Sequence, residues 1–268
     1  MSKAEEFRRL HDGPGAFVIP NPWDIGTAKL LADMGFKALA TTSAGYAFSR
    51  GLPDGGVDFE TMLAHCRELV EAVDLPVSAD LEKGKGDSPE DAAETIRRAA
   101  STGLAGCSIE DSTGDPDRPI FEFSHAVERV AAAVEAARAL GHEFVFTARA
   151  ENFLWGRPDL DDTIRRLQAF EKAGADVLYA PGLSDIAGVK TVCTSVGKPV
   201  NVLAVPGFSV ASLSEAGARR VSVGSKLTTV AFGAVEAAAK EMLEDGTFEY
   251  ARHAMSFAKL QAMFSKGR

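Results

Sequence analysis

Carboxylates follow two apolar, strand-like runs of this chain, at Asp80, Glu82 and Glu110. Acidic groups gathered at neighbouring strand ends repel one another unless a cation lies among them. Oxygen ligands without a suitable set of histidines and cysteines favour Mg²⁺, or Mn²⁺, over zinc. We therefore predict a divalent-metal site that includes these three residues. The alternative, solvated loop carboxylates or helix N-caps, stays open.

An arginine, Arg149, ends a third apolar run. An unpaired guanidinium there would be costly, so it must meet an anion, either from a ligand or from Glu110 or Glu151. Tyr179 and Asn201 lie near the ends of later runs and are candidates for inward polar groups.

A short segment between residues 41 and 45 combines hydroxyls with small residues. Free backbone N–H groups in such a turn suit a carboxylate or phosphonate, although ordinary turn chemistry explains the same residues. The candidates for substrate binding here are Thr42, Ser43, Ala44 and Gly45.

Apolar, β-branched runs alternate with alanine-rich segments of helical period along nearly the whole chain, which indicates parallel βα units. Glycines after the helical segments are typical C-caps. We predict a (β/α)8 TIM barrel as one domain over residues 1–268. Its strands are expected at 16–20, 37–42, 76–80, 106–110, 143–149, 176–180, 199–204 and 219–224, and its helices at 24–34, 59–73, 89–102, 124–140, 160–173, 184–196, 209–215 and 228–243.

Three further segments stand out from this alternation. Residues 43–58 and 112–123 are long connections on the side of the barrel that carries chemistry, so we expect them to contact substrate or form a lid. Residues 247–264 read as an additional C-terminal helix, in an extension of about 245–268.

The composition of the chain restricts the kinds of partner that it is expected to bind. The 268 residues carry a formal net charge of −9 without a cluster of Lys and Arg, which argues against nucleic acid. There is no apolar run of ~18 residues, so we expect no membrane span. Three scattered cysteines and a charged N-terminal segment without signal-peptide features predict a cytoplasmic protein.

Several ordered motifs together resemble the isocitrate lyase and phosphoenolpyruvate mutase superfamily. They are Ile19-Pro-Asn-Pro-Trp-Asp24, Thr42-Ser-Ala-Gly45, Leu52-Pro-Asp-Gly-Gly56, Asp80-Leu-Glu82, Ser108-Ile-Glu-Asp111 and Thr147-Ala-Arg149. The resemblance implies a modified barrel that binds Mg²⁺ and a 2-oxo acid and acts on the C–C or P–C bond beside the carbonyl. It also implies homotetramers whose final helices are exchanged between subunits.

Carried over by position, Asp80 resembles the direct metal ligand, and Asp54, Glu82 and Glu110 its water-mediated shell. Arg149 resembles the arginine that pairs with the reacting anion. The chain departs from the lyases at residues 111–120, where their Lys-Arg-Cys-Gly-His motif is missing, and at Pro181, where lyases tend to have glutamate.

Decarboxylation needs mainly an electron sink, whereas retro-aldol cleavage also needs an acid and a base. We therefore predict a Mg²⁺-dependent lyase that acts on a small 2-oxo acid by oxaloacetate-type decarboxylation through a metal-stabilised enolate, with Arg149, Glu110 and Tyr179 as catalytic residues and Asn201 contacting substrate. The alternatives are P–C chemistry of the phosphonopyruvate hydrolase or mutase type, and a non-catalytic 2-oxo-acid-binding protein.

Overall fold

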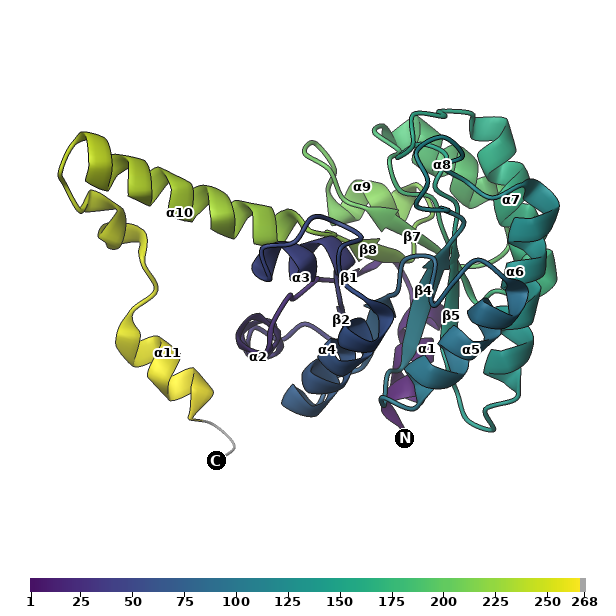
Figure 1. Cartoon of the computed structure of the whole chain (residues 1–268), viewed down its shortest axis with the longest axis horizontal. Helices are drawn as coiled ribbons and strands as arrows, with labels where there is room; N and C mark the ends of the chain where they lie inside the picture. Colours follow the sequence, from purple (N-terminus) through teal and green to yellow (C-terminus); the bar gives the residue numbers. More distant parts are fainter. Residues whose placement is uncertain (266–268) are drawn as a thin grey trace.

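The computed structural model describes residues 1–265 and contains one eight-stranded parallel sheet rolled into a barrel (Figure 1). Its strand order is β1-β8-β7-β6-β5-β4-β3-β2. Each strand falls inside a range expected from the sequence, so the predicted (β/α)8 TIM barrel is confirmed. The strands are β1 (Phe17–Ile19), β2 (Leu39–Ala40), β3 (Val77–Asp80), β4 (Gly106–Glu110), β5 (Val145–Arg149), β6 (Val177–Tyr179), β7 (Val200–Leu203) and β8 (Arg220–Ser222).

The barrel is nearly closed, with its seam between β1 and β2. One backbone hydrogen bond crosses the seam, from Ala40 N to Pro20 O at 3.1 Å. The side chain of Asn21 also forms hydrogen bonds at this seam. Its Nδ2 donates to Thr41 O at 3.0 Å, and its Oδ1 accepts from the N–H groups of Val223 and Gly224 at 2.9 Å each. This amide therefore ties the ends of β1, β2 and β8 together.

Helices follow the strands around the barrel (Figure 1). Glycine ends several of them, as at Gly174, where φ is 104° and an added Cβ would lie 2.9 Å from Val134 Cγ1. Only glycine suits this left-handed, crowded turn. The helices outside the C-terminal extension are α1 (Lys3–Asp12), α2 (Ile25–Asp33), α3 (Ser43–Ser49), α4 (Phe59–Ala72), α5 (Pro89–Ala100), α6 (Phe123–Arg138), α7 (Leu160–Ala173), α8 (Ile186–Ser195), α9 (Val210–Glu215) and α10 (Lys226–Glu244).

Two apolar clusters divide the interior. The larger lies between the strands and the surrounding helices. The smaller fills the lower end of the barrel, where Phe7 of α1 packs with Ile19, Val145 and Val177. Helix α1 thus covers the N-terminal ends of the strands, which we call the barrel floor, and its Ser2–Glu5 capping box fixes its start.

Three segments differ from the sequence-based expectation. Helix α1 was not predicted. Helix α3 occupies the first half of the expected 43–58 connection. The expected single helix over 247–264 is wrong, because Ala254 is extended (ψ 141°) and separates a 3-10 helix, η1 (Glu249–His253), from α11 (Phe257–Phe264). Residues 266–268 of the expected extension lie outside the described residues.

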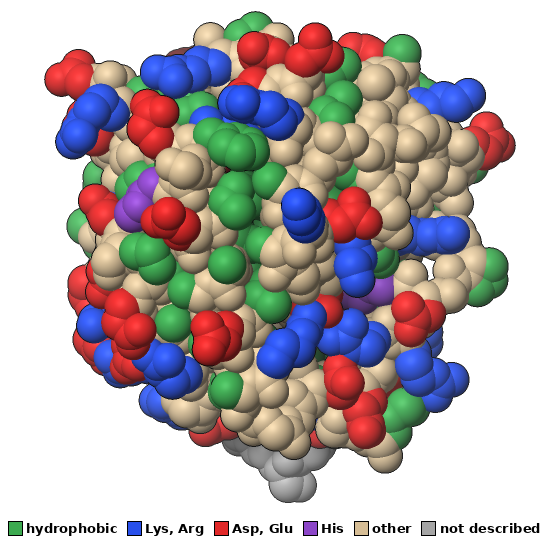
Figure 2. Space-filling model, turned by 90° about the vertical axis from the view of Figure 1, so that its right-hand side faces the viewer, with side chains coloured by type: hydrophobic (Ala, Val, Ile, Leu, Met, Phe, Trp, Pro, Cys, Tyr) green, Lys and Arg blue, Asp and Glu red, His purple; other side chains and the backbone are tan. Residues whose placement is uncertain are grey.

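The long helix α10 leads away from the barrel, and beyond the turn that follows it α11 lies apart from α10 and contacts α2 (Figure 1). Within residues 1–265, no helix has the length and apolar character needed to cross a bilayer. On the face shown in Figure 2, basic and acidic side chains stand side by side, rather than forming a basic patch. That face therefore offers no continuous surface for a phosphate backbone.

Candidate active site at the mouth of the barrel

Arg149 lies at the centre of the C-terminal end of the barrel, which we call the mouth. Its Nε forms an ion pair with Glu151, and its Nη1 lies 3.4 Å from both Asp80 Oδ1 and Glu110 Oε2. Burial lowers the pKa of this guanidinium, but the field of Glu110, Glu151 and Asp80 outweighs burial and holds the pKa well above its ordinary value. The ion pairs left open as an alternative for Arg149 are thus present.

Asp80, the last residue of β3, is held on its other side by α3. Its Oδ2 accepts hydrogen bonds from Ser43 Oγ at 2.9 Å and Ser43 N at 3.4 Å, and its own N–H donates to Thr41 Oγ1 at 2.9 Å. The segment that was expected to grip a substrate carboxylate therefore contacts the predicted metal ligand directly.

The other predicted acidic residues surround Asp80 and repel one another. Burial, then Asp80 and Asp54, raise the pKa of Glu82 to about 7, and burial followed by Asp80 raises the pKa of Asp54. Burial also raises the pKa of Glu110. Glu82 additionally adopts a left-handed backbone with φ 52°, the one non-glycine residue between 1 and 265 that does so.

This set of oxygen donors fits a hard cation by its chemistry. Among residues 1–265, however, no three histidine, cysteine, aspartate or glutamate side chains converge as a ready-made metal cluster. Asp80 and Glu110 are engaged with Arg149 instead. The structure thus brings the predicted ligands to one place, and metal binding stays a prediction.

The start of α3 differs from the expected open turn. Thr42 is the N-cap, and its Oγ1 accepts from Gly45 N at 3.1 Å, so this N–H group is not free. A Cβ at Gly45 would lie 2.5 Å from Thr228 Oγ1 of α10 and 2.5 Å from Thr42 Cγ2. Glycine is therefore required there for close packing, and Thr42, Ser43 and Ala44 remain on the wall of the cavity.

Residues paired in register carry polar groups from the mouth toward the floor. Glu110, Arg149, Tyr179, Asn201 and Arg220 are successive partners across β4 to β8. The Arg149 guanidinium lies 5.2 Å from the centroid of the Tyr179 ring, and burial raises the pKa of Tyr179 to about 12. Asn201 Nδ2 donates to Ser222 Oγ at 3.0 Å. A cavity of about 180 Å³ runs along this row and reaches Asp80, Arg149, Tyr179, Asn201 and Arg220.

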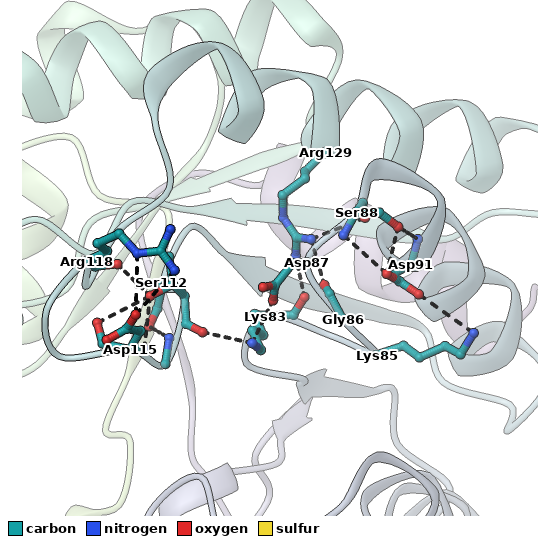
Figure 3. Close-up of polar contacts among 12 residues, drawn as sticks. Lys83, Lys85, Gly86, Asp87, Ser88, Asp91, Ser112, Asp115, Arg118 and Arg129 are labelled. Atoms are coloured by element: carbon teal, nitrogen blue, oxygen red, sulfur yellow. Dashed lines mark hydrogen bonds and ion pairs between the residues drawn. The ribbon is translucent and has the colours of Figure 1, made fainter.

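Two loops flank a wider outer cavity of about 750 Å³. The first loop lies between β3 and α5 and the second between β4 and α6, and Lys83 of the first contacts the second. Its Nζ lies 2.8 Å from Thr113 O and 2.6 Å from Asp87 Oδ1. Arg129 supports the first loop by donating hydrogen bonds to the carbonyls of Lys83, Gly86 (2.7 Å) and Ser88 (3.2 Å) (Figure 3). In the second loop, Arg118 forms an ion pair with Asp115. Both loops therefore have a defined conformation at the mouth.

Sequence reasoning missed three residues of this region. Lys83 followed a predicted ligand, but nothing in its neighbours showed that it would bridge two loops. Arg220 stood beside Arg219, and only the strand register decides which of the two faces inward. Asn21 could have been found, because it lies in the Ile19-Pro-Asn-Pro-Trp-Asp24 motif directly after the first expected strand.

Comparison with known proteins places this arrangement in a family. The model of the phosphoenolpyruvate phosphomutase family matches residues 7–243. The chain belongs to this family. It is 32% identical to an uncharacterised protein of Mycobacterium tuberculosis strain H37Rv, over 96% of this chain and 95% of that protein, and 28% identical to a probable 2-methylisocitrate lyase of Corynebacterium glutamicum, over 92% and 84%.

A solved structure from Burkholderia cenocepacia J2315, provisionally named a lyase/mutase, is 54% identical. The superposition covers 99% of this chain and 96% of that one, with a TM-score of 0.97. Family membership supports an enzyme of the lyase or mutase type, and it leaves the substrate undetermined.

Proposed function

We propose that this family member is a Mg²⁺-dependent lyase that decarboxylates a small 2-oxo-dicarboxylic acid, as in oxaloacetate decarboxylation. The observation that supports it most is the mouth itself, where one buried guanidinium stands among five carboxylates, those of Asp54, Asp80, Glu82, Glu110 and Glu151, beside a polar cavity of about 180 Å³. A cation and a small anionic substrate together would complete this charge pattern.

Asp80 would hold the cation directly, with Asp54, Glu82 and Glu110 acting through water; Mn²⁺ would suit the same oxygen donors. Such a cation supplies Lewis-acid polarisation of the 2-oxo group. A phosphonopyruvate hydrolase whose crystal structure contains oxalate and Mg²⁺ shares this fold, at 22% identity and a TM-score of 0.86. This similarity supports the fold alone, and Mg²⁺ binding by this chain remains our proposal.

The chain's own residues supply binding and proton transfer. Arg149 would orient the second carboxylate of the substrate, while Thr42, Ser43, Ala44 and Asn201 line the remaining wall. Loss of CO₂ leaves a carbanion that takes up one proton. Tyr179 is protonated at neutral pH, because its pKa is about 12, and its Oη is the donor that we assign to this step.

The second loop argues against a full isocitrate or methylisocitrate lyase. Residues 112–123 contain no lysine, cysteine or histidine. We therefore expect no glyoxylate or pyruvate release from either of those substrates. Such release would refute the argument from the missing acid–base residues.

P–C bond chemistry on phosphonopyruvate is the second candidate, favoured by the family model that matches the chain. A non-catalytic binding protein is the third. Purified protein with Mg²⁺, incubated with a panel of 2-oxo acids and phosphonates and followed by ¹H and ³¹P NMR, separates them by product or by absence of turnover. Calorimetric titration with oxalate and Mg²⁺ tests the site in either case, and failure of oxalate to bind would count against the 2-oxo-acid site itself.

The C-terminal extension supports a homotetramer with exchanged helices, which we propose by resemblance. Large apolar side chains along α10 and the extension that follows it are exposed, among them Val235 (68%), Leu243 (86%) and Phe257 (77%). Exposed apolar surface of this kind marks protein interfaces. Light scattering of wild-type protein and a Phe257→Ser variant tests the assembly, and a monomeric wild type would contradict it.

A further inference from the structure

Arg220 is buried at the lower end of the cavity without an acidic partner among residues 1–265. Its three hydrogen-bond partners are Asn201 Oδ1 (2.9 Å), Thr147 Oγ1 (3.0 Å) and His11 Nε2 (3.3 Å), and its side chain is 5% exposed. Each of the three is neutral: the buried His11 has a pKa lowered to about 3, first by burial and then by Arg220. A positive charge is thus enclosed by neutral groups.

Arginine cannot escape this situation by losing its proton, as a buried lysine or histidine does. Burial lowers the pKa of Arg220 only to about 10, and no carboxylate acts to raise it. A buried ion is costly unless an opposite charge accompanies it. Residues 1–265 provide none at this position, so a bound anion would supply the compensating charge.

The surroundings have both the space and the donors for such a charge. The guanidinium has five N–H groups, of which three are used by the protein contacts above, so two remain. Arg220 lines the 180 Å³ cavity together with the hydroxyls of Ser78, Ser108 and Ser222. Asp54 and Asp80, the carboxylates that line the same cavity, belong to its mouth.

We propose that the barrel floor holds a small monovalent anion on Arg220, in a site distinct from the metal site and filled without a metal. The ligand carries a single negative charge and is small enough for the cavity. It is either a halide ion or the carboxylate of a short organic acid. The proposal does not depend on the lyase activity, which places the substrate on Arg149 at the mouth of the same cavity.

Crystals of the metal-free protein soaked in bromide test the site directly. We expect an anomalous peak in hydrogen-bond contact with the Arg220 guanidinium, in wild type and in the matched control Arg219→Gln, which removes an exposed arginine from the neighbouring position. The peak should vanish in Arg220→Met. Persistence of the peak in Arg220→Met would overturn the proposal. Absence of the peak in wild type would exclude a halide, and together with a lack of stabilisation by formate and acetate in the unfolding test it would overturn the proposal even if Arg220→Met fails to fold.

Unfolding in EDTA, at constant ionic strength, distinguishes the two sources of anion. Linkage predicts that an anion at ten times its Kd raises the folding equilibrium constant ~10-fold. We expect this for wild type and Arg219→Gln, and no such rise for Arg220→Met. Stabilisation by bromide and chloride assigns a halide site, and stabilisation by formate and acetate assigns a carboxylate site. Equal responses of all three proteins would show a general salt effect and refute the site.

Discussion

The two arginines that project into the barrel, Arg149 and Arg220, occupy opposite electrostatic surroundings. At the mouth, Arg149 has three carboxylate partners, and the acids there exceed the positive charge available. At the floor, the hydrogen-bond partners of Arg220 among residues 1–265 are an amide, a hydroxyl and a neutral imidazole. We therefore expect the mouth to attract a cation and the floor to attract an anion.

The comparison separates reactivity from structure within one barrel. The proposed cation would relieve the mutual repulsion of the carboxylates at the mouth, which raises the pKa of Glu82 and of Asp54. The floor instead combines a buried charge with an apolar cluster around Phe7, which fixes α1 over the strand ends. Removing a charge should thus change cation binding at the mouth, and both anion binding and stability at the floor.

The largest effect is expected for Asp80→Asn. Removal of the proposed direct ligand should weaken Mg²⁺ binding by more than the ~10–100-fold that is typical of an indirect partner. Calorimetric Mg²⁺ titration measures the affinity, and circular dichroism confirms that the barrel is folded. Asp87→Asn, which removes a largely exposed carboxylate from the adjacent loop, is the control and should bind like wild type. Unchanged affinity in Asp80→Asn would remove this residue from the metal site.

Arg149→Lys should lower kcat/KM by ~100-fold for whichever substrate the panel identifies. A single ammonium cannot reproduce the planar, two-pronged contact of a guanidinium with a carboxylate. Steady-state kinetics measures the loss, and Arg165→Lys on the surface of α7 is the matched control. Activity close to wild type would restrict Arg149 to its ion pairs with Glu151, Asp80 and Glu110.

At the floor, His11 should make the protein sensitive to acid. Its pKa is about 3 in the folded state and about 6.5 in the unfolded state, so between these values the unfolded chain binds more protons. The free energy of unfolding should therefore fall as pH drops below 6.5, by up to ~1.4 kcal/mol per pH unit from this residue. His65, whose pKa burial lowers to about 4, adds a similar slope.

Urea unfolding at pH 7, 6 and 5 tests this dependence. His11→Gln keeps a hydrogen-bonding side chain but does not titrate, so its stability should fall less steeply than that of wild type. His142→Gln, in an exposed turn, should retain the wild-type slope. Identical slopes in wild type and His11→Gln would show that His11 is not held neutral.

Much of the fold could be predicted from the sequence, because the barrel is encoded locally. Apolar runs and helical segments alternate through eight repeats, and glycine ends several of the helices, as at Gly103 before the run 106–110. Helix α1 could not be predicted in this way, since its ten residues are mostly charged and become a helix over the floor through Phe7 and its capping box. The break at Ala254 had no proline or glycine to mark it.

The site residues could be predicted only where the sequence also defines the register of the strands that carry them. Carboxylates and Arg149 at strand ends necessarily meet at the mouth of a parallel barrel, and the motifs of the family identified them. Arg220 was not predictable, because a shift of one residue would have directed Arg219 inward instead. The bridge from Lys83 to Thr113 depends on loop conformations that no periodic pattern specifies.

That bridge gives the smallest expected effect. Lys83→Met removes the contact between the two loops at the mouth while leaving the carboxylates in place, so residues 112–123 should open more often and be cut several-fold faster by proteinase K. Oxalate with Mg²⁺ should slow cleavage in both wild type and variant, because ligand binding at the mouth favours the closed loop. Lys85→Met, which removes a looser ion pair to Asp91 (3.7 Å), is the control and should be cut at the wild-type rate. Equal cleavage of Lys83→Met and wild type would show that the second loop is held by its internal contacts alone, such as Thr113 Oγ1 to Arg118 O at 2.6 Å.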